Sequence, residues 1–191
     1  MLRPDHLHQA RHQLQQLQRA GLWHVELAVR ADSGWVAMAR TLVEEFTALR
    51  LGAASVCRAE DLEAALAAGL GYAVSPILDS SLLEQAAAAE ITLVPGVYTP
   101  SEVAAAVRWG APAVKLYPAA TLGLGYWPSL AGPLQPLPFC IAAGGLAIAD
   151  VRPWMAAGVD AVALGSTLFA SHGTEQELKP GLPDLLSLLS K

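Results

Sequence analysis

Short apolar runs alternate with amphipathic stretches along most of this chain. Seven runs have the length and composition of buried strands, and they recur about every twenty residues. The stretches between them carry apolar residues at helical spacing. The predicted strands are 24–30, 49–56, 71–77, 91–98, 113–118, 138–144 and 161–166, and the predicted helices are about 32–48, 59–68, 79–89, 99–110, 148–157 and 182–189.

Local signals support several of these helix boundaries. Thr99, Pro100 and Glu102 combine an N-cap, a proline in the first turn and an acid that can close a capping box. Gly69 directly follows the second predicted helix, as expected of a C-terminal stop. The regular alternation of strand and helix therefore predicts an α/β protein with a parallel sheet.

The even spacing of the strands favours a closed barrel, because no change of pattern marks the switch point of a doubly wound sheet. An eight-stranded barrel should open with a strand, yet residues 5–20 read as a helix, with Leu7, Leu14 and Leu17 on one face. We therefore predict a TIM (β/α)8-type barrel that lacks the usual first strand, as one domain over residues 1–191 with an N-terminal helix in 1–20. Another chain, the N-terminal segment or a mis-set start could fill the two open edges.

Composition narrows the possible partners. Hydrophobic residues make up 53% of the chain and charged residues 15%, which excludes disorder and suits a sheet covered on both faces. The net charge is −5 without a basic tract, so nucleic acid is not an expected partner, although backbone amides could still bind phosphate. No signal peptide and no membrane-spanning run is visible. Cys57 and Cys140 lack metal-ligand spacing, which predicts buried free thiols, a cytoplasmic location and no metal site.

Lys115 is the residue with the clearest chemical meaning. It lies within the apolar run 113–118, and lysine is rarely buried without a partner. Desolvation favours the neutral amine, which is the form that attacks a carbonyl. A Schiff-base lysine is the functional interpretation, and a lysine that extends from a strand end into water is the structural one.

Two charged residues share the inward face of the first predicted strand. Glu26 and Arg30 follow the period of two that a strand imposes, and Lys115 has the same inward parity on its own strand. The carboxyl ends of barrel strands carry the active site, so these three side chains can meet at one mouth. Lysine, arginine and glutamate together suit a 2-keto acid: an amine for the ketone, a cation for the carboxylate and a base for protons. A purely structural pairing of Glu26 with Arg30 is the alternative.

Glycine-containing turns follow the last two strands. Gly144 and Gly145 follow run 138–144, and Gly165 and Ser166 close run 161–166. If one strand is missing from the front, these are the loops after barrel strands seven and eight, where such barrels bind phosphate. Ordinary turn glycines are the alternative.

At this point the chain resembles the 2-keto-3-deoxy-6-phosphogluconate / 4-hydroxy-2-oxoglutarate aldolases, class I aldolases on a TIM barrel that are usually trimeric. The resemblance runs from about residue 20 to 166. The stretches that carry it are His24-Val25-Glu26-Leu27-Ala28-Val29-Arg30, Gly52-Ala53-Ala54-Ser55-Val56, Val74-Ser75-Pro76, Val94-Pro95-Gly96-Val97, Val114-Lys115-Leu116-Tyr117-Pro118-Ala119, Ala131-Gly132-Pro133, Gly144-Gly145 and Leu164-Gly165-Ser166.

The resemblance implies a reversible cleavage of a 4-hydroxy-2-oxo acid to pyruvate and an aldehyde, without metal or other cofactor, by a cytoplasmic homotrimer. Lys115 would be the nucleophile and Glu26 the acid/base. The implied substrate-binding residues are Arg30, Ser55, Pro76, Gly144, Gly145, Gly165 and Ser166.

Two departures from the family pattern bear on the substrate. The family's Gly-Ala-Gly-Thr is Gly52-Ala53-Ala54-Ser55 here, which keeps a hydroxyl. The family's Pro-Thr-Gly-Gly is Ala142-Ala143-Gly144-Gly145 here, so the threonine hydroxyl is lost at Ala143. A lost hydrogen bond to a charged group costs about 1.5–3 kcal/mol. Two other hypotheses stay open: another phosphosugar-binding barrel enzyme, and a catalytically impaired barrel that binds ligands or partners.

Overall fold

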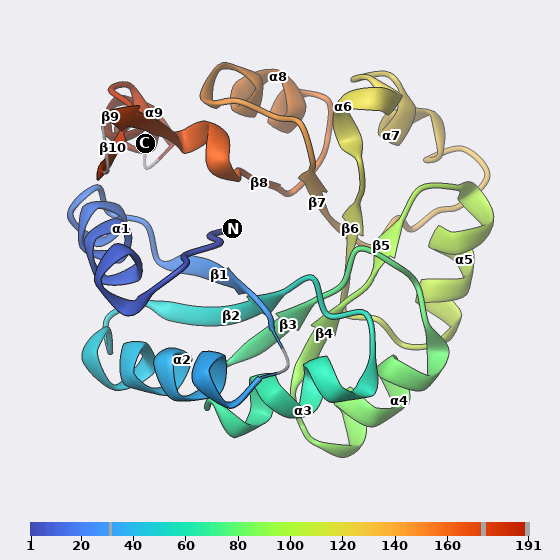
Figure 1. Ribbon diagram of the computed structural model, residues 1–191. Coiled ribbons are helices and arrows are strands. Elements are labelled where there is room, and N and C mark those ends of the chain that lie inside the picture. The colour runs from blue at the N-terminus through green and yellow to red at the C-terminus, as the bar shows by residue number, and fades with distance from the viewer. Residues whose placement is uncertain (31, 173–174, 190–191) are drawn as a thin grey trace.

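Eight short parallel strands form the centre of the computed structural model, which describes residues 1–30, 32–172 and 175–189. They pair in chain order, β1-β2-β3-β4 in one ladder and β5-β6-β7-β8 in the next, and the helices lie outside them (Figure 1). All seven predicted strands are present, one of them in two pieces. Their bounds are β1 His24–Ala28, β2 Arg50–Ala54, β3 Tyr72–Val74, β4 Thr92–Val94, β5 Gly96–Val97, β6 Ala113–Leu116, β7 Phe139–Ala143 and β8 Ala161–Ala163.

The predicted helices are also found, some of them shorter than expected. They are α1 Leu7–Arg19, α2 Ser33–Glu45, α3 Ala59–Ala67, α4 Ser80–Ala88, α5 Pro100–Arg108, the 3-10 turn η1 Ile148–Asp150 with α8 Val151–Ala156, and α9 Leu182–Leu189. The sequence did not reveal the short elements α6 Ala119–Leu122, α7 Tyr126–Ser129 and η2 Ser166–Leu168, or the antiparallel hairpin of β9 Phe169–His172 and β10 Glu175–Leu178.

Alternation along each strand separates the core from the barrel interior. Val25 and Leu27 of β1 pack outward into the layer between sheet and helices, and Val114 and Leu116 of β6 do the same. Lys115, between the last two, has the opposite orientation. The apolar positions therefore fix which face of each strand points inward.

Proline explains why one predicted strand is split. Pro95 lies between β4 and β5 and has no N–H to continue the ladder. Its carbonyl still accepts a hydrogen bond from the Lys115 amide at 2.8 Å, and the Val97 carbonyl accepts one from Tyr117 at 3.0 Å. The two ladders thus follow one another around the barrel.

The N-terminal residues occupy the seam between β1 and β8. Leu2 pairs in parallel with Leu27, donating to Glu26 O at 2.7 Å and accepting from the Ala28 amide at 2.8 Å. On the other side the Met1 amino group donates to Leu164 O at 2.8 Å, and Figure 1 shows this end of the chain inside the ring of strands. Among the described residues, the place of the first strand that we predicted to be absent thus holds one bridging residue, Leu2. The N-terminal segment, one of the three explanations left open, therefore lies along this edge of β1.

The capping box of α5 provides a test of how local signals stabilise the fold. Thr99 Oγ1 accepts from the Glu102 amide at 3.3 Å, and Glu102 Oε2 accepts from the Thr99 amide at 2.7 Å. We expect Thr99→Ala to lower the free energy of unfolding by about 1 kcal/mol, measured by urea denaturation. Ser101→Ala, two positions further along the chain, is the control. A loss of stability as large in the control would show that the cap is not the cause.

Candidate active site

The predicted site residues gather at the carboxyl ends of the strands. Arg30 and Ser55 follow β1 and β2, Pro76 follows β3, and Lys115 lies near the end of β6. Because the strands are parallel and pair in chain order, these ends form one face of the barrel. The loops after β7 and β8 reach the same face.

Lys115 is buried, with 7% of its surface exposed. Desolvation lowers the pKa of its amine, while Glu26 and Cys57 act in the opposite direction and Arg3 acts in the same one. Within the described part of the chain, Nζ has no hydrogen bond or ion pair, and it lies 4.6 Å from the centre of the Tyr117 ring. This environment increases the fraction of neutral, nucleophilic amine.

Glu26 projects from the inward face of β1 and is half-buried. Among the described residues it forms no direct salt bridge with Lys115, but its charge has the largest electrostatic effect on the Lys115 pKa. A carboxylate and an amine near each other, without a direct salt bridge between them, can both act on one bound substrate.

Arg3 belongs to this face of the barrel and was missed by the sequence analysis. Its guanidinium donates to Ser55 Oγ at 3.1 Å, and its charge lowers the Lys115 pKa. Ser55 has a φ of +63°, a conformation that costs non-glycine residues roughly 1–3 kcal/mol and is concentrated at functional sites. The predicted N-terminal helix begins at residue 5, and the four residues before it carry no local signal of a strand or a site.

Arg30 lies two residues beyond the end of β1, so the period of two does not fix its direction. Its Nε is 3.7 Å from Asp32 Oδ2, and both side chains are about half exposed. The cation is therefore accessible at the mouth and is not committed to a buried structural pair. The alternative pairing of Glu26 with Arg30 is not found among the described residues.

The backbone of the loop after β7 requires glycine at two positions. Gly144 and Gly145 have φ of +92° and +77°. A Cβ on Gly144 would lie 2.9 Å from the Tyr117 ring, and one on Gly145 would lie 2.8 Å from Ala120 Cβ. The loop therefore packs closely against the segment that follows Lys115.

The loops after β7 and β8 are tied together. Thr167 Oγ1 donates to Leu146 O at 2.9 Å, and the Gly165 carbonyl accepts from the Leu168 amide at 3.1 Å. The backbone of Ser166 begins η2, and its side chain lies outside what the structure describes. Ala143, at the end of β7, is buried and offers no hydroxyl to a ligand.

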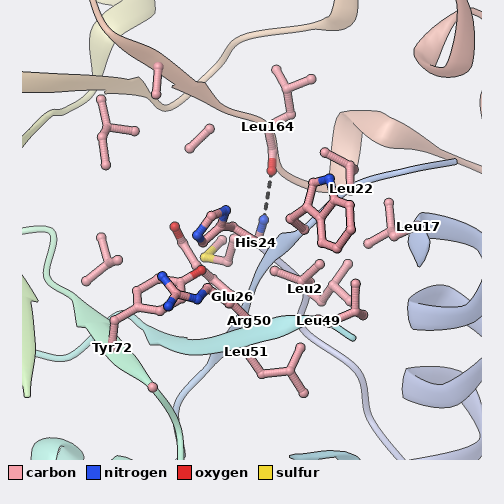
Figure 2. A pocket seen from close by; sticks show the side chains of 18 of the residues that line it. Leu2, Leu17, Leu22, His24, Glu26, Leu49, Arg50, Leu51, Tyr72 and Leu164 are labelled. Carbon is pink, nitrogen blue, oxygen red and sulfur yellow. Dashed lines mark hydrogen bonds between the residues drawn. The ribbon is translucent and has the colours of Figure 1, made fainter. Parts of the chain in front are cut away.

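A cavity of about 960 Å³ lies toward the opposite end of the barrel. Glu26 lines it, and Lys115 is not among the lining residues. Figure 2 shows Glu26, Arg50 and Tyr72 converging there beside the N-terminal residues. Strand-start residues line much of it, among them His24, Arg50, Tyr72, Thr92, Phe139 and Ala161.

Other kinds of site receive no support from the described residues. No three His, Cys, Asp or Glu side chains among them are grouped closely enough to hold a metal ion. None of the helices in the described ranges combines the length and apolar character needed to cross a bilayer.

Comparison with known proteins identifies the family. A family model for KDPG and KHG aldolase matches residues 1–179. The chain is 33% identical over 141 residues to the 2-dehydro-3-deoxy-phosphogluconate aldolase of Pseudomonas aeruginosa, covering 73% of this chain and 63% of that protein. It is 31% identical over 137 residues to the KHG/KDPG aldolase of Escherichia coli K12, covering 71% of this chain and 63% of the relative.

The fold agrees with this assignment. A solved structure described as native KDPGal aligns with a TM-score of 0.81 and 25% identity, covering 91% of this chain and 84% of the other. The KDPG aldolase of Zymomonas mobilis ATCC 29191 aligns with a TM-score of 0.78 at 24% identity, over 98% of this chain and 87% of that one, which supports the fold alone. The predicted TIM-barrel type of α/β fold is thereby confirmed, and the chain belongs to the KDPG and KHG aldolase family.

Proposed function

We propose that this protein is a class I aldolase that reversibly cleaves a 4-hydroxy-2-oxo acid to pyruvate and an aldehyde, with Lys115 as the Schiff-base nucleophile and Glu26 as the acid/base. The observation that carries the proposal is a buried lysine of lowered pKa beside a carboxylate, at the carboxyl end of a barrel strand. Family membership supports the same reaction class.

The chemistry begins at the amine. The neutral Nζ of Lys115 attacks the C2 carbonyl of the keto acid, and the carbinolamine loses water to give an iminium. Glu26 then accepts the proton of the C4 hydroxyl. The C3–C4 bond breaks, the aldehyde leaves, and the electron pair moves into an enamine with the iminium nitrogen as acceptor. Glu26 returns its proton to C3, and hydrolysis of the new iminium releases pyruvate and the free lysine.

Cations and hydroxyls at the mouth suit the ends of such a substrate. Arg30 and the Arg3–Ser55 pair provide donors for the 2-keto carboxylate. Pro76 forms part of the wall beside it: its carbonyl would lie 2.3 Å from a Cβ on Gly96, so only glycine allows this approach. The loops of Gly144, Gly145, Gly165 and Ser166 would bind the distal anion through backbone N–H groups.

The distal anion distinguishes the two candidate substrates. In 2-keto-3-deoxy-6-phosphogluconate it is a phosphate, and in 4-hydroxy-2-oxoglutarate it is a carboxylate on the glyoxylate half. Ala143 removes a hydroxyl close to the path between lysine and anion, which favours the shorter substrate with fewer hydroxyls to bind. We propose a homotrimer in the cytoplasm, as the resemblance implies.

A pyruvate-release assay with both substrates tests the function. We expect turnover of at least one, with a higher kcat/KM for 4-hydroxy-2-oxoglutarate if the missing hydroxyl determines the preference. Ala143→Thr should shift the preference toward the phosphorylated sugar acid by about tenfold, the equivalent of one hydrogen bond to a polar group. A monodisperse trimer that cleaves neither compound would instead support the catalytically impaired barrel.

A further inference from the structure

Glu26, Gly52 and Tyr72 form one row across three neighbouring strands. Glu26 pairs directly with Gly52, and the pairing of Ala53 with Ala73 places Tyr72 beside Gly52 on the other side. All three positions face the barrel interior. Two strand spacings of ~4.8 Å put the Cα atoms of Glu26 and Tyr72 about 10 Å apart.

The glycine in the middle of the row allows the tyrosine to cross it. A Cβ on Gly52 would lie 2.4 Å from Cε2 and Cζ of Tyr72, a distance that no real side chain tolerates. The Tyr72 ring therefore lies flat over β2, with its hydroxyl end directed toward β1. Figure 2 shows Tyr72 and Glu26 entering the same cavity, which both residues line.

The phenol is suited to act as a hydrogen-bond donor. Burial raises the pKa of Tyr72, and the Glu26 carboxylate raises it further, so the hydroxyl keeps its proton at any working pH. Tyr72 and Glu26 both line the cavity, and Lys115 does not. The other charged or titratable groups around the pair are His24, whose ring meets Tyr72 edge-on at 6.1 Å, and Arg50, Lys115, Arg3 and the amino group of Met1.

We propose that the Tyr72 hydroxyl donates to the Glu26 carboxylate, directly or through one water, and orients it for proton transfer at C3 and C4 of the substrate. This inference rests on the proposed function. Tyr72 would be a positioning residue, because it reaches the carboxylate from the cavity side while the substrate binds on the lysine side. Gly52 is then needed for catalysis as well as for packing, since it creates the path that the ring takes.

The test compares Tyr72→Phe with the intact chain. This change keeps the ring over Gly52 and removes only the donor. We expect kcat to fall about tenfold with KM within twofold. Deuterium exchange at the methyl group of pyruvate, which needs the iminium and the base but no aldehyde, should slow by a similar factor.

Two further measurements distinguish a failure of the Tyr72 proposal from a failure of the aldolase proposal. Tyr126→Phe removes a hydroxyl that donates to Tyr98 O outside the barrel and should leave kcat and exchange unchanged. Borohydride trapping of pyruvate at Lys115 should persist in Tyr72→Phe. If trapping persists but kcat and exchange match the intact protein, Tyr72 does not position Glu26. If the intact protein itself fails to trap pyruvate, the aldolase proposal fails, and this inference fails with it.

Discussion

Lys115→Met is expected to abolish the covalent adduct that pyruvate and borohydride form with the protein. It should also lower kcat/KM by about 10⁴-fold, equivalent to ~5.4 kcal/mol of transition-state stabilisation. The reason is that the change removes the amine itself from the end of β6, where Lys115 has 7% of its surface exposed. Intact mass measurement before and after reduction checks the adduct, and peptide mapping places it.

The pH dependence of trapping adds a second readout. Burial lowers the pKa of Lys115 from its ordinary value of 10.5, so neutral amine is present at lower pH than in a free lysine. The trapping rate should therefore reach half its maximum below pH 10.5. A midpoint at or above that value would mean that the amine is not desolvated when it reacts.

Two lysine variants serve as controls. Lys179→Met, at an exposed position just after β10, should trap pyruvate normally. Lys115→Arg keeps the charge but cannot form an imine, so activity that survived in it would favour another phosphosugar-binding barrel enzyme over an aldolase. An adduct retained in Lys115→Met would show that another residue is the nucleophile.

Patterns repeated along the chain were enough to predict the architecture. Each strand buries one face against helices, so the apolar runs mark all seven predicted strands, and Gly69 and Thr99 mark helix ends correctly. Lys115 stood out because a single cation interrupts an apolar run. Such features are local, and they depend only on side-chain type and spacing.

The parts that were missed depend on contacts between distant segments. Two residues are too few to read as a strand, so the role of Leu2 became visible only from its pairing with Leu27. The hairpin of β9 and β10 is held by contacts with α1, such as the bond from the Gln16 side chain to Gln176 O at 3.0 Å. The two-residue period of a strand shows which of its faces is buried. It cannot reveal contacts between segments that are far apart in the chain.

Tyr72 was missed for a related reason. Its sequence context reads as ordinary strand, and its importance lies in the neighbouring glycine on β2, twenty residues earlier in the chain. In the sequence, Gly52 stands out only as part of the family pattern Gly52-Ala53-Ala54-Ser55. A row of inward residues across three strands requires the register of both pairings, which periodicity does not provide.

Replacing Glu26 with glutamine is the second change for which we expect a large effect. Glutamine has nearly the same shape but cannot accept and return a proton, and general acid/base catalysis contributes typically 10²–10⁴-fold. We therefore expect kcat for cleavage to fall by about 10³-fold, with deuterium exchange into pyruvate lost in parallel. The exposed Glu44→Gln on α2 is the matched control and should behave like the intact protein.

Imine formation should respond to Glu26→Gln in the opposite way. The Glu26 charge raises the Lys115 pKa, so its removal lets the amine lose its proton at still lower pH. Pyruvate trapping near neutral pH should therefore be retained or become faster while turnover falls. Such a separation assigns the carboxylate to proton transfer and the amine to bond formation. If trapping and turnover were lost together, Glu26 would be needed to hold Lys115 or the substrate in place, and the acid/base role would have to be given to another residue.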